Sequence, residues 1–320
     1  MKRDFRRLLD VTEGECRHLL DRARFLKDAR RARKTHAPLQ GMTLAMIFEK
    51  ASTRTRISFE VGMAELGGHA IFLDQANTQM GRGEPVRDTA RVLSRYVHGV
   101  MIRTFGQKTV EELAHWCTVP VINGLSDLYH PCQIIADLFT VLEHKGRLDD
   151  VKVAWVGDGN NVANSWIEAS ILLGFPLAVA VPPAYGPHEP LVREAREKGT
   201  LTIYADPYEA VRDADVVNTD VWISMGMEAE VEARKRAFAS FRVDTDLMKA
   251  AKPDAIVLHC LPAHRGEEIT DEVFERFQDV IFTQAENRLH AQKALLEWLM
   301  VSDIPAVDMT ETPRPIRKFR

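Results

Sequence analysis

Met42-Thr43-Leu44-Ala45-Met46-Ile47-Phe48 is the stretch that decides the fold of this 320-residue chain. This apolar run predicts a buried strand. The residues behind it, from Ser52 to Leu66, predict a helix that stops at Gly67-Gly68. Ile57, Val61 and Ala64 fall on one side of that helix. A strand that leads into a helix is the repeating unit of a parallel sheet with helices on its faces.

The same alternation continues through the first half of the chain. Strands are predicted at residues 70–73, 99–103 and 119–122, and helices at 84–97, 110–116 and 131–144. Pro131 is tolerated because it stands in the first turn of the last of these helices. The pattern predicts one parallel sheet for this half.

A polar joint at residues 145–150 separates the first half from a second series of strands. These strands are predicted at residues 151–156, 177–181, 202–204, 216–218 and 255–258, with helices between them. A last helix, Ala291–Met300, has no strand after it and is expected to pack back on the first half. We therefore predict an α/β protein with two doubly wound parallel-sheet domains joined by interdomain helices. The predicted bounds are 1–145, 146–288 and 289–320.

Composition and charge exclude several classes of protein. The chain is 45% hydrophobic and 28% charged with a net charge of −4, so no cationic surface for nucleic acid is indicated. The basic start lacks the apolar stretch of a signal peptide, and no apolar run is long enough to span a membrane. No two cysteines form a Cys-x-x-Cys pair, which favours neither a disulfide framework nor a zinc knuckle. A cytoplasmic location is expected.

An anion site is predicted where the first strand meets its helix, at Ser52-Thr53-Arg54-Thr55-Arg56. Ligands of open α/β sheets bind beyond the carboxyl ends of the strands. The free N–H groups and positive dipole end of a helix attract anions, and arginine offers a fork for two phosphate oxygens. The alternative is that Ser52 only caps the helix and the arginines lie in solvent.

Other polar residues follow later strands. Arg103 ends one strand, and His130 and Gln133 open a helix where both can face the same ligand. His130, Arg103 and Thr55 could together polarise a carbonyl oxygen, because donors aimed at developing negative charge stabilise it. A lone histidine is more often structural, so the proposed role of His130 depends on its lying together with Arg103 and Thr55.

Four motifs, in order, resemble a known family. Phe48–Arg56 and His130–Gln133 look like the two carbamoyl-phosphate motifs of the aspartate and ornithine carbamoyltransferases. His259–Ala263 (HCLPA) and Asp220–Gly226 (DVWISMG) are similar to the ornithine branch, whereas the aspartate branch typically carries His-Pro-Leu-Pro. The matches run from residue 42 to residue 288. Ala51 and Met227 depart from the usual Pro and Gln, which leaves kinetic constants open.

The resemblance implies residue roles, no cofactor and no metal. Carbamoyl phosphate would be bound by Ser52, Thr53, Arg54, Thr55, Gln79, Arg103, His130, Gln133, Cys260, Leu261 and Arg288. Gln79 would come from a neighbouring subunit, so the resemblance also implies a homotrimer with shared active sites. The amino-acid end of ornithine would be held by Asn161, Asp220, Ser224 and Met225. The catalytic residues would be Arg103, His130 and Cys260.

The implied reaction is attack of ornithine's side-chain amine on the carbamoyl carbon, giving citrulline and phosphate. Biosynthetic rather than catabolic use is expected. The amine, with an ordinary pKa near ~10.4, must react in its neutral form. Burial and arginine charge disfavour the ammonium, and closure of the Ser224–Gly226 loop is expected to exclude water. We expect Cys260 to contact the amine and to be able to exchange a proton with it. His259, its neighbour in a strand, points to the opposite face and is badly placed to activate a thiolate nucleophile.

Alternatives stay open at this point. Val156-Gly157-Asp158-Gly159 begins like a dinucleotide fingerprint, but Val162 replaces the third glycine and no acidic residue ends the next strand. A non-catalytic binding protein of the same fold, and a transferase for putrescine or N-acetylornithine, are further readings. A metal site at His259, Cys260 and His264 is disfavoured because Pro262 interrupts the segment.

Overall fold

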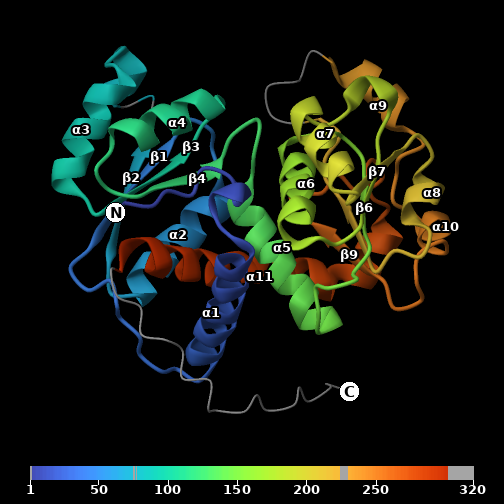
Figure 1. Ribbon diagram of the computed structural model, residues 1–320, viewed down its shortest axis with the longest axis horizontal. Coiled ribbons are helices and arrows are strands. Elements are labelled where there is room, and N and C mark those ends of the chain that lie inside the picture. The colour runs from blue at the N-terminus through green and yellow to red at the C-terminus, as the bar shows by residue number, and fades with distance from the viewer. Residues whose placement is uncertain (1, 75, 77, 224–229, 302–320) are drawn as a thin grey trace.

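The computed structural model describes residues 2–74, 76, 78–223 and 230–301 (Figure 1). Two lobes lie side by side, and each is built on its own sheet. None of the helices in the described ranges is both long and apolar enough to cross a membrane.

The first lobe contains a four-stranded sheet of order β2-β1-β3-β4, in which every pairing is parallel. Its strands are β1 (Thr43–Phe48), β2 (His69–Asp74), β3 (Gly99–Arg103) and β4 (Val121–Leu125). Phe48 pairs with Arg103, so β1 and β3 end together at the same edge. This edge carries the loops in which the anion site was predicted.

Helices cover both faces of this sheet. The helical elements are η1 (Leu8–Asp10), α1 (Glu13–Arg31), α2 (Thr53–Glu65), η3 (Met80–Arg82), α3 (Val86–Tyr96), α4 (Gln107–Trp116) and α5 (Pro131–Lys145). Leu44 and Met46 of β1 join the core formed with α1, α2 and α5. Ala45 and Ile47 point the other way, to the core formed with α3 and α4. The alternation of side chains along a strand explains the two cores.

The second lobe contains a five-stranded parallel sheet of order β7-β6-β5-β8-β9. Its strands are β5 (Val153–Val156), β6 (Leu177–Ala180), β7 (Leu201–Tyr204), β8 (Val216–Thr219) and β9 (Ile256–His259). Its helical elements are α6 (Asn161–Leu173), η4 (Pro183–Tyr185), α7 (Glu189–Glu197), α8 (Pro207–Val211), α9 (Val231–Phe238), α10 (Thr245–Met248) and α11 (Asp271–Met300). Two doubly wound parallel-sheet lobes confirm the predicted fold class.

The last helix is longer than predicted. The sequence indicated Ala291–Met300, but α11 begins at Asp271, where the Thr270 side chain caps it. The first turns were missed because buried polar residues such as Gln284 and Arg288 interrupt the apolar periodicity. In Figure 1, α11 crosses from β9 in one lobe to α2 in the other, and it contacts both.

The predicted apolar side of α2 is not its buried side. Ile57 is 54% exposed, whereas Phe59, Gly62 and Met63 are buried. The orientation is set by α11, which passes so close that a Cβ on Gly62 would lie 3.3 Å from Cγ of Lys293. A contact more than 200 residues away in sequence therefore decides which face of α2 is buried.

The order of strands reverses once in each sheet, between β1 and β3 and between β5 and β8. Ligands of open α/β sheets bind at such a switch point, beyond the carboxyl ends of the strands. The loops after β1 and β5 lie at these two points, and both open a helix.

Candidate active site

The segment Ser52–Arg56 both caps a helix and leaves donors free. The Oγ of Ser52 accepts from the N–H of Thr55 at 3.2 Å, so the capping interpretation is correct for Ser52. Nothing in the described ranges accepts from the N–H groups of Thr53 and Arg54. These two groups, at the positive end of the α2 dipole, remain available to an anion.

Three arginines converge on this helix start. Arg288 of α11 donates from Nη2 to Oγ1 of Thr55 and from Nη1 to Oε1 of Gln133, both at 2.7 Å. Arg103 is 7% exposed, and no described residue accepts a hydrogen bond from its side chain. Burial, followed by the charges of Arg288 and Arg54, lowers the pKa of Arg103 to about 10. This uncompensated positive charge favours a bound anion.

His130 is the N-cap residue of α5 and is held from the other lobe. Its backbone N–H donates to Oγ of Ser165 in α6 at 2.8 Å. Burial, followed by Arg288, Arg103 and Arg54, lowers the pKa of His130 well below its ordinary value of 6.5. The imidazole is therefore neutral at physiological pH and can donate one hydrogen bond toward a carbonyl oxygen.

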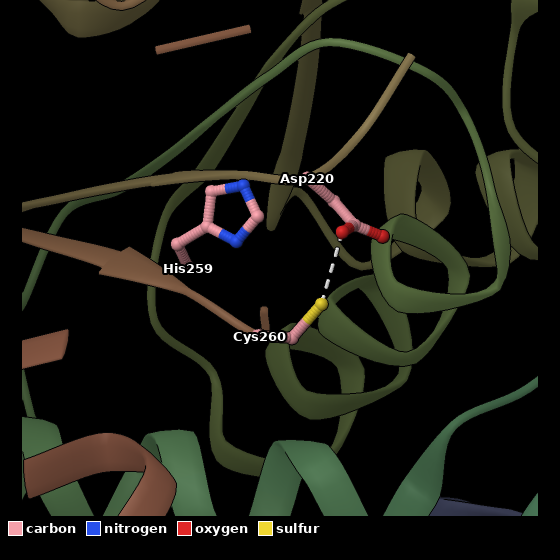
Figure 2. A group of neighbouring side chains, drawn as sticks. All are labelled: Asp220, His259 and Cys260. Atoms are coloured by element: carbon pink, nitrogen blue, oxygen red, sulfur yellow. Dashed lines mark hydrogen bonds between the residues drawn. The ribbon is translucent and has the colours of Figure 1, made fainter. Parts of the chain in front are cut away.

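A thiol and a carboxylate meet at the ends of β8 and β9 (Figure 2). Sγ of Cys260 donates to Oδ1 of Asp220 at 3.0 Å, and Nδ2 of Asn160 donates to Oδ2 of Asp220 at 2.9 Å. Burial, followed by the Asp220 carboxylate, raises the pKa of Cys260 well above 9.0. Cys260 is thus a protonated thiol, which disfavours the nucleophile interpretation.

His259 is engaged away from Cys260. Its Nε2 lies 3.0 Å from Oε1 of Glu268, and its Nδ1 accepts from the N–H of Leu261 at 2.9 Å. Figure 2 draws the side chains of Asp220, His259 and Cys260, and among these three only Cys260 and Asp220 are joined by a hydrogen bond. Both ring nitrogens of His259 are in use, so a metal could bind the ring only by displacing one of these partners.

Within the described ranges, two groups of side chains have spacings that could hold a metal ion. Asp220, His259 and Cys260 form one group, and His264, Glu267 and Glu268 form the other, with ligand atoms within 4.8 Å in each. His264 therefore does not lie with Cys260, as the considered trio of His259, Cys260 and His264 would require.

Contacts across the lobes bring the two ends of the site together. Nη2 of Arg54 donates to the carbonyl of Leu261 at 2.8 Å. Nδ2 of Asn161 donates to the carbonyl of Ser126 at 2.6 Å, which leaves its second hydrogen for a ligand. The switch points of the two sheets thus face each other, with the arginines on one side and Asp220 and Cys260 on the other.

One described site residue, Gln79, is not brought together with the others. Gln79 is exposed at the start of η3, beyond the edge strand β2, and its side chain hydrogen-bonds to none of the described residues. Ser224 and Met225 lie outside the described residues.

Each lobe matches a family model. Residues 3–143 match the carbamoyl-P binding domain of aspartate/ornithine carbamoyltransferase, and residues 149–299 match the Asp/Orn binding domain of the same family. The chain belongs to the aspartate/ornithine carbamoyltransferase family. The resemblance seen in the four sequence motifs is confirmed.

Relatives of this carbamoyltransferase chain extend over almost its whole length. The ornithine carbamoyltransferase of Geobacter metallireducens is 57% identical, with 94% of this chain and 100% of that protein covered. The structure of the Pyrococcus furiosus ornithine carbamoyltransferase is 52% identical and has a TM-score of 0.90, covering 94% and 98%. An anabolic ornithine carbamoyltransferase from Campylobacter jejuni is 44% identical with a TM-score of 0.88, covering 93% and 99%.

Sequence reasoning missed several residues that support the carbamoyltransferase site. Asn160 was passed over, although a cap residue next to a predicted ligand is a usable signal, and its Oδ1 caps α6. Asp137 and Gln284 were also missed. The spacing of Gln133 and Asp137 on an otherwise apolar helix was the available clue.

Proposed function

We propose that this chain is an ornithine carbamoyltransferase, which transfers the carbamoyl group of carbamoyl phosphate to the side-chain amine of L-ornithine and forms L-citrulline and phosphate. The observation that carries the proposal is the opposition of charges across the lobes. On one side, Arg103 and Arg288 have no carboxylate partner among the described residues, and the Asp220–Cys260 pair lies on the other side. The names of the relatives support the same reaction.

The phosphate would bind at the start of α2. Donors to its oxygens would be the free N–H groups of Thr53 and Arg54, the hydroxyls of Ser52 and Thr55, and the guanidinium of Arg54. Gln133 and Arg288, already hydrogen-bonded to each other, would lie at the carbamoyl end with the Leu261 carbonyl. Charge balance supports this placement, because a phosphate would neutralise the surplus of guanidinium groups.

Ornithine would bind from the second lobe. Asp220 would accept from its α-ammonium, and the second amide hydrogen of Asn161 would reach its carboxylate. Ser224 and Met225, which precede α9, remain proposed ligands on the strength of the motif alone. The free α-amino and carboxylate pair that these residues recognise favours ornithine over putrescine or N-acetylornithine.

The transfer step needs a neutral amine and a polarised carbonyl. Arg103 and neutral His130 would donate to the carbonyl oxygen as the nitrogen attacks and a tetrahedral centre forms. The new carbon–nitrogen bond is kept, the bond between the carbamoyl carbon and the phosphate oxygen breaks, and phosphate leaves. The proton lost by the nitrogen can pass to the Asp220 carboxylate through the Cys260 thiol, since the two are hydrogen-bonded.

We further propose a homotrimer in which Gln79 completes the site of a neighbour. The edge strand β2 and the outer side of α2 expose Ile57 (54%), Ile71 (39%) and Phe72 (36%). Exposed edges and apolar patches of this kind are usually covered by a partner. Gln79 lies just beyond the same strand, which supports its delivery to another subunit.

The other assignments follow from this function. Residues 1–145 would form the carbamoyl-phosphate domain and 146–288 the ornithine domain, and the segment that begins at residue 289 would return to the first; its residues 302–320 lie outside the described residues. The four cysteines are free, which supports the reducing cytoplasm as the location. The anabolic neighbour supports use in arginine biosynthesis.

A product assay with a panel of amines tests the proposal. Carbamoyl phosphate is supplied with ornithine, putrescine or N-acetylornithine, and carbamoylated product is measured for each. We expect citrulline, with turnover of the other two amines at least about 100-fold lower, the scale of a lost charge-assisted contact. Comparable turnover of putrescine would overturn the ornithine assignment, and NADH oxidation with a keto acid would restore the dinucleotide interpretation.

A further inference from the structure

One buried carboxylate oxygen joins the two halves of the site. Asp137, in the second turn of α5, is fully buried, and its Oδ1 accepts two hydrogen bonds. One comes from Nε2 of Gln133 at 2.8 Å and the other from Nε2 of Gln284 at 2.7 Å. Asp137 is hydrogen-bonded to neither Asn161 nor Asp220, and it has no place in the proposed transfer step.

The amide orientations of both glutamines are fixed by their other partners. Oε1 of Gln133 accepts from Nη1 of Arg288, and Oε1 of Gln284 accepts from the backbone N–H of His259 at 2.8 Å. Neither partner can act as an acceptor, so each glutamine must turn its NH₂ group to Asp137. The direction of both contacts therefore follows from chemistry.

The first arm leads to the carbamoyl-phosphate end of the site, where Arg288 meets the start of α2. Gln133 holds Nη1 of Arg288, and Nη2 of the same guanidinium holds Oγ1 of Thr55 at 2.7 Å. Because a guanidinium is planar and rigid, fixing one nitrogen also fixes the direction of the other. Asp137 thus determines, through Gln133, where Arg288 lies relative to the start of α2.

The second arm leads to the acceptor end. Gln284 holds the backbone of His259, the last residue of β9. Cys260 follows directly, and its thiol meets Asp220. The next residue, Leu261, presents the carbonyl that accepts from Arg54. A shift of Gln284 would therefore move the end of β9 and, with it, the groups between the two substrates.

We propose that Asp137 is a positioning residue that couples the carbamoyl-phosphate end of the site to its acceptor end, by holding Gln133 and Gln284 on a single oxygen. The inference rests on the proposed function, since it assigns Asp137 a role in the same transfer. It adds a residue that touches neither substrate. It also explains why a carboxyl group is placed between α5 and α11 at a depth where no described cation is its direct partner.

The chemistry of the carboxyl group suggests informative variants. The second oxygen, Oδ2, has no hydrogen-bond partner among the described residues, and burial raises the pKa of Asp137 to about 7. An asparagine has the shape of a neutral aspartic acid, and its amide oxygen can accept both glutamine donors. An alanine removes the acceptor and leaves two buried NH₂ groups without a partner.

A matched control is present on the same pair of helices. Thr140 lies one turn further along α5, is also fully buried, and accepts at Oγ1 from Nδ2 of Asn287 in α11 at 2.9 Å. Thr140→Val removes a hydrogen bond between α5 and α11 without touching either arm. It reports what a loss of helix packing alone does to the enzyme.

The experiment compares steady-state kinetics and phosphate binding of the whole enzyme. Asp137→Ala should lower kcat/KM for both substrates at least tenfold. It should weaken the binding of inorganic phosphate, measured by calorimetry, by a similar factor. Asp137→Asn should stay within about threefold, as expected when both acceptor contacts persist. Gln284→Met should lower kcat/KM for ornithine by a larger factor than it weakens phosphate binding, since only the second arm is cut.

The double variant Asp137→Ala/Gln284→Met tests whether the two residues act through the same contact. On the ornithine side it should be no worse than Asp137→Ala alone, because residues acting through one contact are not additive. Additive losses, equal losses in Thr140→Val, or unchanged phosphate binding in folded Asp137→Ala would each overturn the coupling. If Asp137→Ala fails to fold, Gln284→Met becomes the test. A Gln284→Met variant with an unchanged kcat/KM for ornithine would then overturn the coupling. Absence of citrulline from the parent enzyme would instead refute the proposed function, and the phosphate measurements would still decide the first arm.

Discussion

Cys260 and Asp220 are hydrogen-bonded at the point where the two lobes meet, with Sγ of the thiol 3.0 Å from Oδ1 of the carboxylate. The two residues directly follow the last residues of β8 and β9, Thr219 and His259, so their relative position is set by the pairing of these strands. The carboxylate beside it helps to keep the buried thiol protonated. An amine that binds between this pair and the arginines would meet an acceptor for its proton and a polarised carbonyl.

The first prediction concerns the thiol. Cys260→Ala removes a contact to the reacting amine and one step of the proton path, but no covalent intermediate. We expect kcat to fall about 10- to 100-fold, with KM for carbamoyl phosphate changed by less than about threefold. Steady-state kinetics measure both. Mass spectrometry of the parent enzyme quenched during turnover should find no carbamoylated Cys260, and a trapped adduct would reverse the assignment.

The second prediction concerns the carboxylate. Asp220→Asn keeps the shape of the side chain but removes its charge. We expect KM for ornithine to rise about 10- to 100-fold, the effect of losing a charge-assisted hydrogen bond to an ammonium. Phosphate binding, measured by calorimetry, should stay within about twofold because the start of α2 is unaltered. An unchanged KM for ornithine would contradict the proposed binding role.

The third prediction tests the shared site. Arg54→Ala and Gln79→Ala chains should each be nearly inactive alone. Mixed after dissociation, they should recover activity, because a hybrid trimer contains sites formed from one unaltered Arg54 and one unaltered Gln79. Native mass spectrometry verifies the mixing, and a mixture of Arg54→Ala with Thr55→Ala serves as a control without recovery. Verified hybrids without activity would count against a site shared between subunits.

The fourth prediction concerns pH and stability. Burial raises the pKa of Asp137 from 3.8 to about 7, so between these values the folded chain keeps a proton that the unfolded chain releases. The contribution to the free energy of unfolding is thus fully present below about pH 4 and is lost as pH rises to about 7. At about 1.4 kcal/mol per pKa unit, the loss amounts to at most about 4 kcal/mol.

Asp137→Asn removes this titration. The free energy of unfolding of the variant, relative to the parent, should therefore rise by a few kcal/mol between about pH 4 and pH 7. Urea unfolding at four pH values across this range measures the difference. A constant difference would show that Asp137 does not exchange its proton differently in the folded and unfolded chains.

Much of the fold was accessible from the sequence because parallel strands leave strong local signals. The strand ending at Phe48 and the helix opened by His130 and Pro131 were placed correctly, since an apolar run or a proline at a helix start is decided by neighbouring residues. The buried face of α2 was not accessible. It depends on the approach of α11 to Gly62, which no local pattern around Ile57 encodes.

The site was partly accessible for the same reason. Arg103 and His130 could be proposed because they follow strands, where ligands of this fold gather. The spacing of Gln133 and Asp137 could have drawn attention to Asp137, but its role could not be predicted, because that role also depends on Gln284, which arrives from α11. Polar residues buried inside a helix pair show their role only once the helices are placed against each other.

The most direct test of the whole account is citrulline formation by the purified chain from carbamoyl phosphate and L-ornithine, with phosphate release measured in the same samples. We predict equal amounts of citrulline and phosphate, in the absence of any added cofactor. Replacement of Arg103 by alanine should reduce both by about 100-fold or more, the scale of a lost donor to a developing oxyanion. Phosphate release without citrulline, or no reaction with the parent chain under conditions where it binds phosphate, would contradict the account.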